Sequence, residues 1–178
     1  MGQVQSPKPV KLFVGMLAAR AEWLDRAAER LAARYGEVDL VSGTLPFSFT
    51  RYYEHEMGAN LLRRFVSFRE LIAPDRLPTI KRQANDLEQE LAASLGAAVP
   101  RPVNLDPGYL AAGKIVLATT KDYSHRLYLG EGIYGEATLH FLKGRWEPWP
   151  WTYPDYRSES YATFFLDLRR RYLEQLKP

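Results

Sequence analysis

One stripe of apolar side chains constrains the fold of this chain more than any other feature. Between positions 77 and 95 apolar residues recur at intervals of three and four, which is the repeat of a helix that buries one face. The stripe consists of Leu77, Ile80, Ala84, Leu87, Leu91 and Leu95. Gly96 follows, and glycine readily adopts the left-handed conformation that ends helices. The spacing predicts an amphipathic helix that Asp75 caps at its N-terminus.

The segments before this helix predict three strands and one more helix. A nearly unbroken apolar run over residues 11–17 predicts a buried strand, and apolar residues within 23–35 recur at helical spacing. Strands are also predicted over residues 38–45 and 61–72. The aromatic and polar residues 46–58 between these two strands predict an extended excursion.

The second half of the chain predicts a loop, several short strands and a terminal helix. Residues 99–113 contain Pro100, Pro102 and the sequence Asp106-Pro107-Gly108, so they predict a loop. After this loop the pattern predicts strands over 114–119, 126–129, 133–141 and 145–147. A strap of proline and aromatic residues follows over 148–156, and an amphipathic helix begins after Ser158.

The order strand, helix, strand, strand, helix, strand is that of a split βαβ unit, in which the sheet has a ferredoxin-like topology. The sequence therefore predicts an α+β fold, with this sheet extended by C-terminal β-hairpins and a terminal helix. A parallel doubly wound sheet is the alternative, weakened by two consecutive strands without a helix between them. One domain over residues 1–178 is expected, with residues 1–9 as a disordered tail.

Composition excludes several classes of protein. The 178 residues include no Cys, which removes disulfides, thiolate metal sites and cysteine nucleophiles. The apolar stretches are too short to span a membrane, and the polar N-terminus does not resemble a secretory signal, so a cytoplasmic location is expected. The net charge of +3 is small, so attraction of an anionic partner would depend on clustered cations.

The densest group of reactive side chains lies in residues 119–126, directly after a predicted strand. Thr119 and Thr120 supply hydroxyl groups, Lys121 and Arg126 can hold a phosphate or carboxylate, and His125 can transfer a proton near neutral pH. Loops that leave the edge of a sheet often carry ligand-binding groups. A solvated turn in which Asp122 caps its own backbone explains the same residues equally well.

A glycine motif follows this loop. Gly130, Gly132 and Gly135 match the pattern Gly-x-Gly-x-x-Gly, but a strand follows rather than the helix that a dinucleotide site requires. The glycines lack side chains and would let the backbone approach an anion, as in a lid over phosphates, and Tyr134 beside them is a further ligand-binding candidate. The alternative is a tight hairpin whose glycines adopt positive φ angles.

Alternation along the strand 133–141 separates two faces. Tyr134, Glu136, Thr138 and His140 fall on one face, opposite Leu139 and other apolar residues. This polar face can hold a ligand, with Glu136 or His125 as the acid/base group of any catalysis and Lys114 as a further ligand-binding candidate. A half-solvated antiparallel sheet has the same pattern.

The sequence predicts no metal site. On a strand, His55 would point away from Glu54 and Glu56, and the chain has only 3 His in total. Asp106 is expected to begin a turn, and it becomes a metal or general-base candidate if Glu136 converges on it.

Several phrases resemble one uncharacterised bacterial family, domain of unknown function 4416. The phrases are Leu105-Asp106-Pro107-Gly108-Tyr109-Leu110, Leu117 to Arg126, Gly132-Ile133-Tyr134 and Trp151-Thr152-Tyr153-Pro154-Asp155-Tyr156. Some members of the family are labelled GTP-binding, and the resemblance implies the same here. The chain has no Gly-x-x-x-x-Gly-Lys-Ser/Thr loop, so it lacks the backbone cradle for phosphate and the magnesium-binding hydroxyl of P-loop chemistry.

The function expected from these residues is binding of an anionic small molecule or nucleotide between the loop, the glycine hairpin and the polar strand face. Two alternatives stay open, a single-stranded RNA-binding module and a scaffold that uses the aromatic strap as a protein interface. The sequence specifies no cofactor and does not decide whether turnover occurs.

Overall fold

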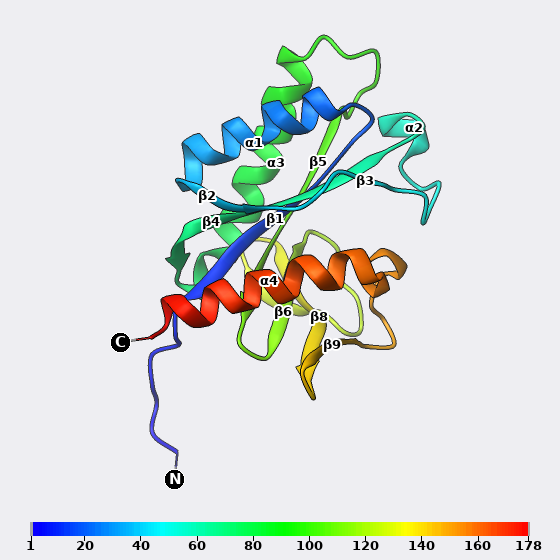
Figure 1. The fold of residues 1–178 in the computed structure, drawn as a ribbon. Helices are drawn as coiled ribbons and strands as arrows, with labels where there is room; N and C mark the ends of the chain where they lie inside the picture. Colours follow the sequence, from blue (N-terminus) through cyan, green and yellow to red (C-terminus); the bar gives the residue numbers. More distant parts are fainter. Residues whose placement is uncertain (1, 178) are drawn as a thin grey trace.

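The computed structural model describes residues 2–177, whose strands form one antiparallel sheet with helices on both faces (Figure 1). The helices are α1 (Ala21–Tyr35), α2 (Glu54–Met57), α3 (Leu77–Ser94) and α4 (Glu159–Gln175). The strands are β1 (Val10–Ala18), β2 (Val38–Val41), β3 (Leu45–Pro46), β4 (Leu62–Ile72), β5 (Val103–Ala111), β6 (Lys114–Thr119), β7 (Leu127–Gly130), β8 (Ile133–Leu142) and β9 (Arg145–Pro148). No helix within residues 2–177 is long and apolar enough to cross a membrane.

The strand order confirms the predicted α+β fold. The sheet runs β2-β4-β1-β5-β6-β8-β7, and every ladder in it is antiparallel. The first four strands of this order, joined by α1 and α3, form the split βαβ unit. Strands β6 to β9 extend the sheet, and helix α4 follows them in the chain. The parallel alternative is wrong.

The segment predicted to be a loop is the fourth strand of this unit. Residues 103–110 pair with β1, from Ala18↔Val103 to Lys11↔Leu110. Strand β6 pairs with β5 only from Gly108 onward, so Pro107 has a neighbouring strand on one side alone. Proline has no N–H to donate, and sheets accept it where no ladder needs that donor. The residues that suggested a turn, Pro107 and Gly108, therefore lie where the ladder between β5 and β6 begins.

Gly108 is required at this place by crowding. A Cβ atom there would lie 2.6 Å from the Val116 carbonyl oxygen and 2.7 Å from Cζ of Phe13. The missing side chain lets β5 and β6 meet under the ring of Phe13. We call the point at Pro107 and Gly108, where β5 and β6 part, the fork.

Two apolar cores hold the layers together. Helices α1 and α3 pack on one face of the sheet, and α4 packs on the other with Phe13, Phe65 and Leu139 (Figure 1). The predicted cap at Asp75 is wrong, because this residue lies in a 3-10 turn and no side chain caps α3. Residues 2–9 are exposed and form neither helix nor strand, and Met1 lies outside the described residues.

A bulge in β8 overturns the predicted alternation. The register shifts between Ile115 and Val116 of β6, which leaves Thr138 as an extra residue in β8. Glu136 pairs with Leu117, and Leu139 pairs with Ile115. Because paired residues share a face and Ile115 and Leu117 lie two apart, Glu136 and Leu139 face the same side. Glu136 is accordingly buried and not on a solvated face.

Gly108→Ala should lower the free energy of unfolding by about 1–3 kcal/mol, because the new methyl group overlaps a backbone oxygen that cannot move aside. Urea denaturation measures the loss. The control is Gly113→Ala in the turn between β5 and β6, where a Cβ meets no heavy atom within 4 Å. Equal stability of the two variants would contradict the role assigned to Gly108.

Candidate functional site

A cleft of about 1080 Å³ opens at the fork. Strands β5 and β6 are not paired with each other beside the cleft. Residues 103–107 of β5 pair with β1 alone, while Ala118 and Thr119 of β6 pair with β8. The cleft therefore takes side chains from both faces of the sheet. Its walls are α3, the segment 47–56, the end of β6 and the strap residues 153–156. Its size suits a small-molecule site.

Asp106 lies on the floor of this cleft between two cations. Its Oδ2 accepts hydrogen bonds from Asn104 at 2.6 Å and from Nη1 of Arg63 at 3.4 Å, and Nζ of Lys81 lies 3.7 Å from Oδ1. Desolvation alone would raise the pKa of the Asp106 carboxyl, but attraction to Lys81 and Arg63 outweighs it. The pKa therefore lies below its usual range, and the group is an anion.

Arg63 links this floor to the strap. Its side chain is only 3% exposed, and Nη2 lies 3.5 Å from Oδ2 of Asp155. Burial works against the charged guanidinium, yet the nearby oxygens of Tyr156 and Asp106 outweigh it and raise the pKa of Arg63. Burial raises the pKa of the Asp155 carboxyl, and Arg63 offsets only part of this effect. The guanidinium also lies 5.2 Å from the ring of Phe47.

Helix α3 holds the start of β5 through a second group of charges. Glu88 accepts the Leu105 N–H at 2.7 Å, and Nζ of Lys81 donates to the Leu105 carbonyl at 2.8 Å. Arg101 donates to Glu88 at 3.0 Å and also to Asn104. Burial raises the pKa of Glu88, although Lys81 and Arg101 lower it. These bonds replace the strand ladder that β5 lacks beside the cleft.

Aromatic side chains form the rim of the cleft. The aromatic rim consists of Phe47, Phe49, Tyr52 and Tyr53. Burial raises the pKa of Tyr53 to about 12. Nζ of Lys121 donates to the Tyr52 hydroxyl at 3.0 Å and lies 4.9 Å from the centre of its ring. Lys121 thus connects the rim to the loop 119–126.

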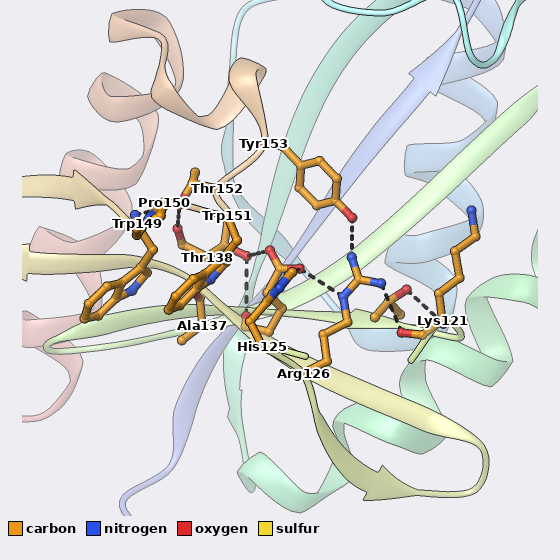
Figure 2. Close-up of polar contacts among 12 residues, drawn as sticks. Lys121, His125, Arg126, Ala137, Thr138, Trp149, Pro150, Trp151, Thr152 and Tyr153 are labelled. Atoms are coloured by element: carbon orange, nitrogen blue, oxygen red, sulfur yellow. Dashed lines mark hydrogen bonds and ion pairs between the residues drawn. The ribbon is translucent and has the colours of Figure 1, made fainter. Parts of the chain in front are cut away.

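Three of the residues predicted from sequence gather beside the cleft. Glu136 is 2% exposed, and its Oε2 lies 3.0 Å from Nε of Arg126 and 3.0 Å from Nε2 of His125. Arg126 also donates to the Lys121 carbonyl at 3.0 Å and to the Tyr153 hydroxyl at 2.6 Å (Figure 2). The Arg126 guanidinium therefore braces the loop against the strap. An acid/base role for Glu136 or His125 stays a prediction.

Behind this cluster the rings of Trp149 and Trp151 from the strap stack on each other, and His125 stacks on Trp151 (Figure 2). His140 packs against Trp149 with its ring tilted by 33°. The rings of Trp149 and Trp151 are 5.3 Å apart and within 8° of parallel. His125 covers the outer face of Trp151, and His140 lies 4.2 Å from Trp149. Each indole therefore packs against the other indole and against one histidine ring, although Trp151 is still 37% exposed.

The residues predicted to bind a ligand divide between the cleft and other places. Thr119, Thr120, Lys121 and Glu136 line the cleft. Lys114 lies at the opposite end of β6, beside a separate hollow near Tyr172. The structure does not bring Gly130, Gly132 and Tyr134 to the cleft.

The hairpin 130–132 has the geometry of a tight turn. Gly130 and Gly132 have φ angles of 114° and 76°, as the hairpin alternative requires. Glu131 between them accepts a hydrogen bond from Thr79 at 2.8 Å and pairs with Arg82. The turn therefore docks on the start of α3.

A partial phosphate-loop motif also lies elsewhere. Gly108, Gly113 and Lys114 have the P-loop spacing, but Ile115 stands where a Ser or Thr is needed. The segment forms the turn of the β5–β6 hairpin, in which Ala111 pairs with Lys114. No helix follows it, so it cannot form that phosphate cradle.

Sequence reasoning missed the floor of the cleft. Arg63, Lys81, Glu88 and Asn104 received no role, and Asp106 was expected to begin a turn. One signal was present, because Lys81 and Glu88 lie at helical spacing from Leu77 and Ala84 on the apolar stripe of α3. Charged residues at that position face the sheet and need partners there.

The fold and the cleft define the class, an α+β protein whose ferredoxin-like sheet parts around a charged cleft. The family model described as Domain of unknown function (DUF4416) matches residues 8–172, which include every residue that lines the cleft. The chain belongs to this family, as the resemblance predicted. Comparisons with curated proteins and with solved structures give no match.

Glu136→Gln should lower the free energy of unfolding by about 1–3 kcal/mol, because Arg126 and His125 lose a buried anionic partner. Chemical denaturation measures the change. Glu147→Gln on β9 breaks an exposed pair with Arg145 and should cost less than about 0.5 kcal/mol. If the two variants are equally stable, the Glu136 cluster does not brace the loop.

Asp106→Asn should destabilise the protein most near neutral pH. A carboxyl whose folded pKa is lowered adds stability above its unfolded pKa of about 3.9, and this stability is lost as pH falls through the folded value. The difference between wild type and variant in urea denaturation should therefore shrink below about pH 4.

Asp155→Asn is the matched control, because the pKa of this carboxyl is raised in the folded protein. Its favourable contribution is present below the unfolded pKa and lost as pH rises through the folded value. The two variants should therefore respond to pH in opposite directions. A common direction would contradict the ionised state assigned to Asp106.

Proposed function

We propose that the cleft binds an anionic small molecule of nucleotide size. The observation that carries the proposal is the pairing of its cations. Arg63, Lys81 and Arg101 each have carboxylate partners, whereas Lys121 has a hydroxyl partner and no carboxylate among residues 2–177. An unpaired cation at a concave site is suited to an anionic group of a ligand.

The groups around Lys121 support the same proposal. Thr119 and Thr120 line the cleft beside it and offer hydroxyl groups to an anion. The aromatic rim provides flat apolar surface, with Tyr52 being 66% exposed. A base or another planar group could pack there while the anionic group meets Lys121. In this proposal Arg126 supports the loop and does not touch the ligand.

RNA binding is the less favoured alternative, because each indole that would stack on bases already packs against the other indole and against a histidine ring. A protein-interaction role would fit the exposed Leu127 and Tyr128 on the edge strand β7 better than the strap, with exposures of 74% and 63%.

Thermal-shift and calorimetric titrations with ATP, GTP, ribose phosphate and inorganic phosphate test the proposal. A bound anion should raise the melting temperature by mass action. Lys121→Ala should weaken binding by about fivefold, as expected for loss of one solvent-exposed charge contact, and the effect should fall in high salt.

The matched control is Lys114→Ala, which removes the same charge at the opposite end of β6 and should leave binding unchanged. Absence of a shift with every one of these anions would overturn the proposal. So would equal weakening by the two lysine variants, since this would mean that only net charge matters.

A further inference from the structure

The floor of the cleft offers one acceptor without a donor. Oδ2 of Asp106 receives hydrogen bonds from Asn104 and Arg63, but the nearest cation to Oδ1 is Nζ of Lys81 at 3.7 Å. This distance is too long for a hydrogen bond, and no other donor within residues 2–177 reaches Oδ1. The Asp106 side chain is 28% exposed, so a ligand can reach it.

The buried carboxylates of the cleft already bind partners within the protein. Glu88 binds the Leu105 N–H and Arg101, and Glu136 binds Arg126 and His125. Asp155 is 6% exposed and faces Arg63. Asp106 is therefore the carboxylate on the floor of the cleft that is still able to accept a hydrogen bond from a ligand.

The charge around Asp106 decides which donor can approach. The carboxyl is ionised, so it accepts a hydrogen bond and cannot donate one. Lys81 and Arg63 lie within 4 Å of its oxygens and would repel a ligand ammonium group or a metal cation. A hydroxyl group carries no charge and can donate, so it meets both conditions.

We infer that the ligand of this cleft is a hydroxylated anion, such as a ribosyl or other sugar phosphate, and that Asp106 accepts a hydrogen bond from one of its hydroxyl groups. Asn85 and Gln89 of α3 also line the cleft and can serve a neighbouring hydroxyl as donor or acceptor. The inference rests on the proposed function, in which the anionic group of the ligand lies at Lys121. It adds that the other end of the ligand is polar and uncharged and lies at Asp106.

The test compares ligands that differ only in hydroxyl groups. Wild-type protein is titrated with ATP and GTP and with their dideoxy analogues, and with ribose phosphate and deoxyribose phosphate. Charge and base are constant within each pair. The hydroxylated member should bind about tenfold more tightly, the effect of one hydrogen bond to a charged acceptor. This comparison needs no variant and so does not depend on the stability of one.

Asp106→Asn then assigns the acceptor. The variant should bind the hydroxylated ligand about as weakly as wild type binds the dideoxy analogue, while its affinity for the analogue itself changes little. Asp39→Asn makes the same chemical change in a buried ion pair with Lys11, outside the cleft, and should keep the full preference. Circular dichroism confirms that each variant is folded.

The outcomes separate the two proposals. If the hydroxylated and deoxygenated ligands bind wild type with equal affinity, the inference is overturned and the proposed anion site stands. If Asp106→Asn keeps the wild-type preference, Asp106 is not the acceptor and the inference is overturned as stated. If none of these anions binds, the proposed function fails and the inference fails with it.

Discussion

Pro107 has no N–H for a neighbouring strand, and Gly108 has no side chain to hold one away. The ladder between β5 and β6 therefore starts at Gly108 and cannot extend toward Val103. Beyond that point the two strands part, and each keeps its other neighbour. The sheet stays continuous on one side of the fork and opens on the other, and the cleft exists because of this asymmetry.

A sheet that opens exposes polar backbone groups and leaves space that apolar side chains do not fill. Charged side chains from both faces complete the structure there, with Lys81 and Glu88 reaching from α3 and Arg63 from β4. Buried charges are costly unless each has an opposite partner and hydrogen bonds. Negative and positive side chains alternate along the floor of the cleft, in the order Asp155, Arg63, Asp106 and Lys81. Each charge therefore has an opposite partner, and Oδ1 of Asp106 is left open toward the cleft.

The residues around Glu136 have a different role from those on the floor. Arg126 joins Glu136, the Lys121 carbonyl and Tyr153, so it ties β8, the loop and the strap together. The stacked rings behind it hold the strap against β8, where Trp151 donates to the Ala137 carbonyl at 3.1 Å. One wall of the cleft is thereby fixed, and Lys121 is placed at its mouth.

The sequence alone determined the class of fold, because the stripe on α3 and the order of strands and helices are local patterns. The family resemblance was also legible in short phrases. The sequence did not reveal that 103–111 is a strand, since proline and glycine predict a turn wherever the neighbouring strands are unknown. It also could not place Glu136, because the bulge at Thr138 depends on the register with β6.

The loop 119–126 was recognised as a place for an anion, but its partners were not. Periodicity concerns one element at a time, whereas Arg63, Lys81 and Asp106 come from three elements and acquire their chemistry only by meeting. The state of Asp106 shows the reason. Its charge is set by the two cations that the sheet and α3 bring to it, and no pattern within its own strand contains that information. The elements were thus determined by sequence, and the site was decided by tertiary structure.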